Sequence, residues 1–188
     1  MPEPLHEDAR SVLREWQAPD PAQEELRREY LAHLDRHPDG MWRSCRPGHV
    51  TASAAIVDPE GRGMVLTLHR RIGLWLQVGG HCEPVDRSLA GVALREATEE
   101  SGIAGLRLLP SPLRLDRHRV GCGSGSWHLD VQYAAVAPAG AALTRVAEES
   151  DDLRWFPIDA LPEPSDDACR ALAAAASAAV RGAVPSGG

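Results

Sequence analysis

A cluster of three glutamates in the middle of the chain, Glu96, Glu99 and Glu100, offers the side chains best suited to bind a metal ion. On a helical wheel with about 100° per residue, they lie at about −20°, −80° and +20° from Leu89, in line with the apolar residues of the preceding turns. Burying like charges without a counter-charge is very costly, and a divalent cation is the simplest compensation. Because carboxylates offer only oxygen ligands, the pattern favours Mg²⁺ or Mn²⁺ over Zn²⁺. Arg95 lies four residues before Glu99 and is expected to pair with it.

A helix over residues 88–101 must position these glutamates, and Gly102 is expected to end it. Short β-rich runs precede and follow this helix. They cover residues 50–57, 64–69, 74–78, 106–109, 113–120, 127–136 and 153–156. The third run is expected to end before Gly79 and Gly80, and an Ala-rich helix is predicted between Pro164 and Val180. Strands with one central helix, and a terminal helix on the other side, indicate an α/β or α+β sandwich.

The N-terminal part of the chain is predicted to be a helical extension over residues 1–45. Its strongest helical pattern covers residues 22–37, with Pro21 well placed at the start. The extension is expected to pack on the domain or on a second subunit, which leaves room for a homodimer. The domain itself is predicted over residues 46–182, and the small-residue tail over 183–188 is expected to be flexible.

The stretch from Gly80 to Ile103 resembles the Nudix box. The second half of the box matches at every spacing, through the residues Arg95, Glu96, Glu99, Glu100, Gly102 and Ile103. The first half departs from the family pattern, because Asp86 stands where a Glu is usual and eight residues instead of seven separate it from Arg95. One extra residue ahead of the helix can be absorbed in the loop without rotating the glutamates. The resemblance covers about residues 49–164.

This resemblance implies an α/β/α sandwich around a mixed β-sheet. It also implies hydrolysis of a diphosphate linked to another group, usually a nucleoside diphosphate. Glu96, Glu99 and Glu100 would hold one or more Mg²⁺ ions, with the carbonyl of Gly80 as a further ligand. The implied chemistry is physically sound, because a metal ion offsets phosphate charge and lowers the pKa of bound water while a carboxylate takes the proton.

The box leaves the general base open, because related enzymes use either a box glutamate or an acid from a later loop. Glu99 is the first choice, with Arg95 orienting it, and Glu149 is the reserve. The neighbouring acids of that later loop are Glu148, Asp151 and Asp152. Each of these acids also fits a solvated surface loop.

Four further residues are candidates for contact with the substrate: Arg71, His128, Asp130 and Phe156. His128 and Asp130 alternate along one predicted strand and share a face, where they either line a pocket or are satisfied polar residues. Arg71 could reach a phosphate but also fits the surface end of a hairpin, and Phe156 could stack on a base but also fits the core. The glycine-rich run over residues 120–125 is interpreted as a turn between strands, because no helix follows it.

The charge balance excludes several kinds of chemistry. All 20 basic residues are arginine, and the formal net charge is −7. Without lysine, the chain cannot use a Schiff-base lysine, a PLP lysine or a P-loop lysine. The acidic balance argues against binding to a nucleic acid polymer, although a small nucleotide-type substrate can enter together with Mg²⁺.

The cysteines are widely spaced and form no CxxC pair, which indicates reduced thiols in a cytoplasmic protein. A zinc site that joins His81 and Cys82 with Cys45 or Cys122 has no supporting ligand spacing. No apolar run approaches the roughly 20 residues needed to span a bilayer, so no membrane partner is expected.

Two other functions share the expected fold. One is a catalytically inactive nucleotide-binding or regulatory module, against which the intact pairs Arg95-Glu96 and Glu99-Glu100 argue. The other is a prenyl-diphosphate isomerase, for which the position of Cys82 near the box gives faint support. The fold alone cannot decide among them.

Overall fold

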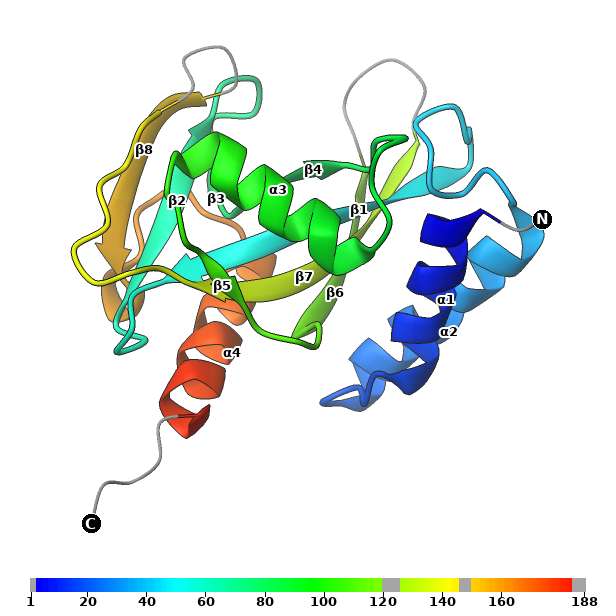
Figure 1. The fold of residues 1–188 in the computed structure, drawn as a ribbon, viewed down its shortest axis with the longest axis horizontal. Helices are drawn as coiled ribbons and strands as arrows, with labels where there is room; N and C mark the ends of the chain where they lie inside the picture. Colours follow the sequence, from blue (N-terminus) through cyan, green and yellow to red (C-terminus); the bar gives the residue numbers. More distant parts are fainter. Residues whose placement is uncertain (1–2, 120–125, 146–149, 184–188) are drawn as a thin grey trace.

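The computed structural model describes residues 3–119, 126–145 and 150–183 of the chain (Figure 1). Its helices are α1 (Pro4–Glu15), α2 (Pro21–Arg36), α3 (Leu89–Ser101) and α4 (Asp167–Ala183), with a short 3₁₀ helix at Ile158–Ala160. Its strands are β1 (Gly48–Val57), β2 (Gly63–His69), β3 (Trp75–Leu76), β4 (Val78–His81), β5 (Arg107–Leu108), β6 (Arg114–Arg119), β7 (Trp127–Val136) and β8 (Ser150–Pro157). Within this part of the chain, no helix is both long and apolar enough to cross a lipid bilayer.

All of these strands belong to one mixed sheet. Its main order is β3-β2-β1-β7-β5, and β4, β6 and β8 pair with β1, β7 and β2, respectively. The strands β1 and β7 are parallel over their full lengths, from Gly48 opposite Trp127 to Val57 opposite Val136. The other pairings are antiparallel. The predicted mixed sheet is therefore confirmed.

Helices cover both faces of the sheet, with α3 in front of it and α4 behind it in Figure 1. Val50 and Ala52 of β1 are buried in one cluster with Leu89 and Val92 of α3. Further along β1, Ala55 points to the other face and is buried with residues of α4. Because successive residues of a strand point to opposite faces, this alternation confirms the α/β/α arrangement.

The α4 side of the sheet begins with polar residues. In β1 these are His49, Thr51 and Ser53, and their partners across the parallel pairing to β7 are His128, Asp130 and Gln132. The side chains of His49, Thr51 and Ser53 are nevertheless buried. We call these six residues the polar row. Buried polar groups need partners, so this row is a natural place to look for a ligand site.

The N-terminal extension packs on its own domain, which was one of the two predicted arrangements. Leu13 and Tyr30 are fully buried in the cluster that includes β1 and α3. Gln23 exchanges two hydrogen bonds with the backbone of Leu115, at 3.0 Å and 2.6 Å. The Trp16 indole donates to the carbonyl of Pro112 at 2.7 Å. The helices α1 and α2 are thus part of the folded core.

The prediction of a single strand over residues 74–78 is wrong. The chain forms two short strands there, and both Gly79 and Gly80 lie inside β4. Gly79 pairs with Ser53, and a Cβ atom added at Gly79 would lie 2.5 Å from the Ser53 Cα. These glycines therefore allow neighbouring elements to approach closely. In sequence, such a glycine pair looks the same as a turn.

The helix that carries the glutamates begins and ends as expected. The Ser88 side chain accepts a hydrogen bond from the backbone N–H of Gly91, and Gly102 has the left-handed conformation with φ 67°. The thiols of Cys45, Cys82 and Cys169 are buried and unpaired. Cys122, the glycine-rich run over residues 120–125 and the tail from residue 184 lie outside the described residues.

Candidate active site

Arg95 is the centre of an ion-pair network between α3 and the end of β4. Its guanidinium contacts Asp86 at 3.0 Å, Glu96 at 2.9 Å and Glu99 at 3.2 Å. It also donates to the backbone carbonyl of His81 at 2.9 Å. The hydrogen bond to Asp86 raises the pKa of Arg95 above its ordinary value. The predicted pair with Glu99 is confirmed, and the network fixes two of the three box glutamates.

Glu96 and Glu100 lie directly against the two glycines of β4. A Cβ atom on Gly80 would be 2.6 Å from the Glu96 carboxyl carbon, so only glycine leaves room for that carboxylate. The Glu100 carboxylate accepts a hydrogen bond from the backbone N–H of Gly79 at 3.0 Å. The strand and the helix are thus in close contact here, and the carboxylates of α3 are donors suited to a hard divalent cation.

The prediction that all three glutamates share the buried stripe of α3 is wrong for Glu99. The Glu99 side chain is 59% exposed, whereas that of Glu96 is 15% exposed. At about −80° on the wheel, Glu99 is the furthest of the three from the centre of the stripe. It therefore lies at the rim of the cluster, held by Arg95 and open to a ligand from solvent.

Asp86 anchors Arg95 from the loop before α3. Both of its carboxylate oxygens accept from the guanidinium, and one also accepts from the backbone N–H of Glu83 at 2.7 Å. Burial acts to raise the pKa of Asp86, but these hydrogen bonds outweigh it and hold the pKa below its ordinary value. Asp86 is thus fixed to Arg95 across the loop that leads into α3.

The start of α3 is fixed by the N-terminal extension. The carboxylate of Asp8 in α1 accepts a hydrogen bond from the backbone N–H of Leu89 at 2.7 Å. A negative charge at the N-terminus of a helix is favourable, because unpaired N–H groups and the helix dipole both point there. The extension therefore helps to position the helix that carries the glutamates.

Asp130 is the best-connected member of the polar row. Its carboxylate accepts from Ser53 at 2.6 Å, from Thr51 at 3.0 Å and from Gln132 at 3.3 Å. Burial raises the pKa of Asp130 despite these hydrogen bonds. These contacts support the interpretation of Asp130 as a satisfied polar residue that orders the row, which was one of its two predicted roles.

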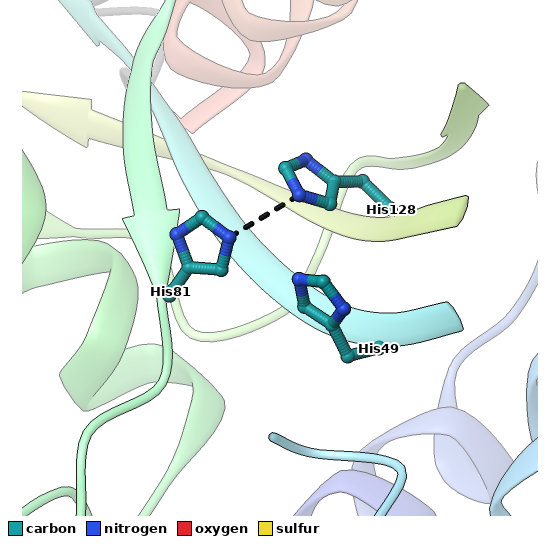
Figure 2. Close-up of side chains that lie close together, drawn as sticks. All are labelled: His49, His81 and His128. Atoms are coloured by element: carbon teal, nitrogen blue, oxygen red, sulfur yellow. Dashed lines mark hydrogen bonds between the residues drawn. The ribbon is translucent and has the colours of Figure 1, made fainter. Parts of the chain in front are cut away.

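His128 lies beside two other histidines, His49 of β1 and His81 of β4 (Figure 2). Burial lowers the pKa of His81 to about 4 and that of His128 to about 3, with nearby positive charge contributing. Burial also lowers the pKa of His49. All three rings are therefore neutral at pH 7. Sequence reasoning missed His49. Like His128, it lies at the start of a strand, and knowledge that the two strands pair in parallel would have placed the two histidines side by side.

The other candidate residues do not join this arrangement. Arg71 lies exposed in the turn between β2 and β3, and Phe156 of β8 packs edge-on against Trp75 at 4.8 Å. Asp151 pairs with Arg70, and Asp152 pairs with Arg154. Glu148 and Glu149 lie outside the described residues.

The family model described as NUDIX domain matches residues 47–175. A NUDIX-family hydrolase from Clostridium perfringens is 22% identical with a TM-score of 0.56, covering 70% of this chain and 95% of its own. A MutT NUDIX hydrolase from Burkholderia pseudomallei is 27% identical with a TM-score of 0.52, and the match covers 66% of this chain and 95% of that protein. A C. elegans Ap4A hydrolase, in a binary complex, is 19% identical with a TM-score of 0.54, and the match covers 71% of this chain and 98% of that protein. No curated protein sequence matches the chain.

Proposed function

The chain belongs to the Nudix hydrolase family, which acts on pyrophosphate bonds, and from this we propose that it hydrolyses a diphosphate linkage in a nucleoside diphosphate derivative with the help of Mg²⁺. One observation carries the proposal. Arg95 pairs with Glu96 and Glu99, and the backbone N–H of Gly79 binds Glu100, so each of the three carboxylates has a partner that orients it near one end of α3.

The donor set fits the proposed ion. Three carboxylates and the carbonyl of Gly80 supply only oxygen, which suits Mg²⁺ and also accommodates Mn²⁺. Three like charges on neighbouring turns of one helix are unfavourable, and Arg95 offsets only part of their charge. A divalent cation would balance the remainder. When bound, it would offset the negative charge of the diphosphate and acidify the attacking water.

The protein side chains have separate roles in this proposal. Glu96 and Glu100 bind the ion, and Glu99 both binds the ion and accepts the proton of the attacking water as general base. Arg95 orients Glu99 through their 3.2 Å contact. The exposure of Glu99 supports its role, because a base must reach water that arrives with the substrate. Glu149 stays as the reserve base.

The isomerase alternative loses its support. Cys82 is buried in the core, its thiol donates to the carbonyl of Val50, and burial raises its pKa to about 12. A thiol in this state is a structural group, because reactive thiols are accessible and ionise readily.

The test is release of phosphate or pyrophosphate from a panel of nucleotides, nucleotide sugars and dinucleotides in the presence of Mg²⁺. The Ap4A hydrolase among the structural neighbours motivates the dinucleotides. We expect turnover that disappears with EDTA and returns with Mg²⁺. Replacing Glu99 or Glu100 with Gln should lower kcat by at least about 100-fold, since metal-assisted charge stabilisation supplies several kcal/mol.

The matched control is Thr98→Ala, because Thr98 is exposed on the same helix and bonds only to the carbonyl of Leu94 among the described residues. This variant should keep near-native turnover. Near-native rates in both Glu99→Gln and Glu100→Gln would contradict the assignment of the metal site. No turnover on any compound of the panel would favour the binding module instead.

A further inference from the structure

Three histidine side chains from three different strands meet on the α4 side of the sheet (Figure 2). Each of His49, His81 and His128 offers a ring nitrogen, and these nitrogen atoms lie within 4.8 Å of one another. The Nε2 atoms of His81 and His128 are 3.2 Å apart. Two imidazole nitrogens bound to one tetrahedral Zn²⁺ at about 2.0–2.1 Å lie roughly 3.3 Å apart. The two rings are therefore already at the separation that such an ion requires.

His49 provides an independent observation. It is only 5% exposed, and neither of its ring nitrogens has a hydrogen-bond partner among the residues that the structure describes. A buried polar group without a partner is costly, and such cases call for an explanation. The ring of His49 lies 5.1 Å from that of His81 and 4.8 Å from that of His128, so a ligand between the three would satisfy it.

This cluster is separate from the carboxylates of the candidate active site. Gly80 and His81 are neighbours in β4, so they face opposite sides of the strand. Gly80 lies against Glu96 of α3, whereas His81 lies against the histidines of β1 and β7. The two clusters also differ in chemistry, because one offers oxygen and the other offers only imidazole nitrogen. Imidazole suits zinc and other transition metals rather than Mg²⁺.

We propose that His49, His81 and His128 bind one Zn²⁺ ion. Three imidazoles leave a fourth position for water, which is the composition of an open zinc site. His81 and His128 are only partly buried, so the cluster extends to the surface of the described residues. This proposal does not rest on the proposed hydrolase function.

Arg43 gives the proposal a specific consequence. Its Nη2 atom lies 2.6 Å from His81 Nδ1, and since arginine only donates, the ring hydrogen of His81 must be on Nε2. That hydrogen points to His128 Nε2, into the place of the ion. Zinc binding moves the hydrogen to Nδ1 and breaks the contact with Arg43. Arg43 therefore competes with the metal, both through this hydrogen bond and through its positive charge.

The experiment is calorimetric titration of the full-length protein with Zn²⁺ in excess Mg²⁺, which occupies the carboxylate cluster. We expect one Zn²⁺ ion per chain. His81→Gln and His128→Gln should each weaken binding by at least about tenfold. Arg43→Met should strengthen it by about threefold to tenfold, because it removes one competing hydrogen bond. Arg46→Met, in the same exposed loop, is the control and should leave the affinity unchanged.

A second group, His37, Asp39 and Cys45, also brings three metal-binding side chains together and must be distinguished. His37→Gln should therefore keep the wild-type affinity. Circular dichroism of each variant checks that the fold is kept. Because Arg43 is exposed, its replacement by Met is not expected to weaken Zn²⁺ binding through a loss of packing. The proposal is overturned by absence of Zn²⁺ binding, by unchanged affinity in both His81→Gln and His128→Gln, or by loss of binding only in His37→Gln.

Discussion

At the scale of single residues, the active-site geometry depends on Asp86 as much as on the glutamates. Its side chain is 6% exposed and accepts from Nε and Nη2 of Arg95, whereas Glu99 accepts from Nη1. Arg95 in turn contacts Glu96, so the loss of one buried carboxylate would free a cation among the proposed metal ligands. Asp86 is thus a positioning residue that acts through Arg95.

Replacing Asp86 with Asn should lower the free energy of unfolding by about 2 kcal/mol, because it breaks a largely buried charged pair. It should also lower kcat by about tenfold to 100-fold and raise the Mg²⁺ concentration needed for half-maximal rate. Denaturant unfolding and Mg²⁺ titration of the rate measure both effects.

Two companion variants make this a test of positioning. Asp86→Glu restores the carboxylate and should recover most of the activity, whereas Glu83→Gln, on an exposed neighbour in the same loop, should behave like the wild type. If Asp86→Glu regained the stability of the wild type but not its activity, the positioning role would be contradicted.

At the scale of elements, α3 could be predicted from sequence and β4 could not. The helix has local signals: an apolar stripe, the cap at Ser88 and the left-handed Gly102. The strand depends on its pairing with β1, which is a contact between distant segments. The local sequence shows this pairing only through the two glycines of β4. The same limit explains why the box glutamates could be named in advance while His49 could not, since only strand pairing brings it to His81 and His128.

The two glycines of β4 should respond differently to alanine. Gly79→Ala places a Cβ atom 2.5 Å from the Ser53 Cα, which is backbone and cannot move away, so the free energy of unfolding should fall by about 3 kcal/mol. At Gly80→Ala the nearest atoms belong to the Glu96 carboxylate, the end of a flexible side chain. It should change stability little but displace a metal ligand. Thermal unfolding and the Mg²⁺ dependence of the rate separate the two outcomes, and equal loss of stability in both would contradict this account.

At the scale of the whole molecule, the buried histidines make stability depend on pH. His81 and His128 have pKa values of about 4 and about 3 in the folded protein, below the ordinary 6.5. Between about pH 4 and pH 6.5 the unfolded chain therefore binds more protons than the folded chain, and stability falls as the pH is lowered through this range.

In EDTA, the free energy of unfolding should be lower at pH 5 than at pH 7, and His128→Gln should reduce this difference. His118 provides a comparison of opposite sign, because its hydrogen bond to Asp116 raises its pKa. Its contribution is present below pH 6.5 and is lost as the pH rises, so His118→Gln should increase the difference between pH 5 and pH 7. Equal pH dependence in all three proteins, measured by urea unfolding, would contradict these assignments.

The parallel pairing of β1 with β7 also has a kinetic consequence. Thr51 and Asp130, which it brings together, are 79 positions apart in the chain. Contacts between such distant segments form slowly, because the intervening loop must be closed first. His49 and His128 meet only through this pairing. Zn²⁺ at the proposed site would therefore bind the chain only after these strands have paired, and would stabilise the folded chain against the unfolded one.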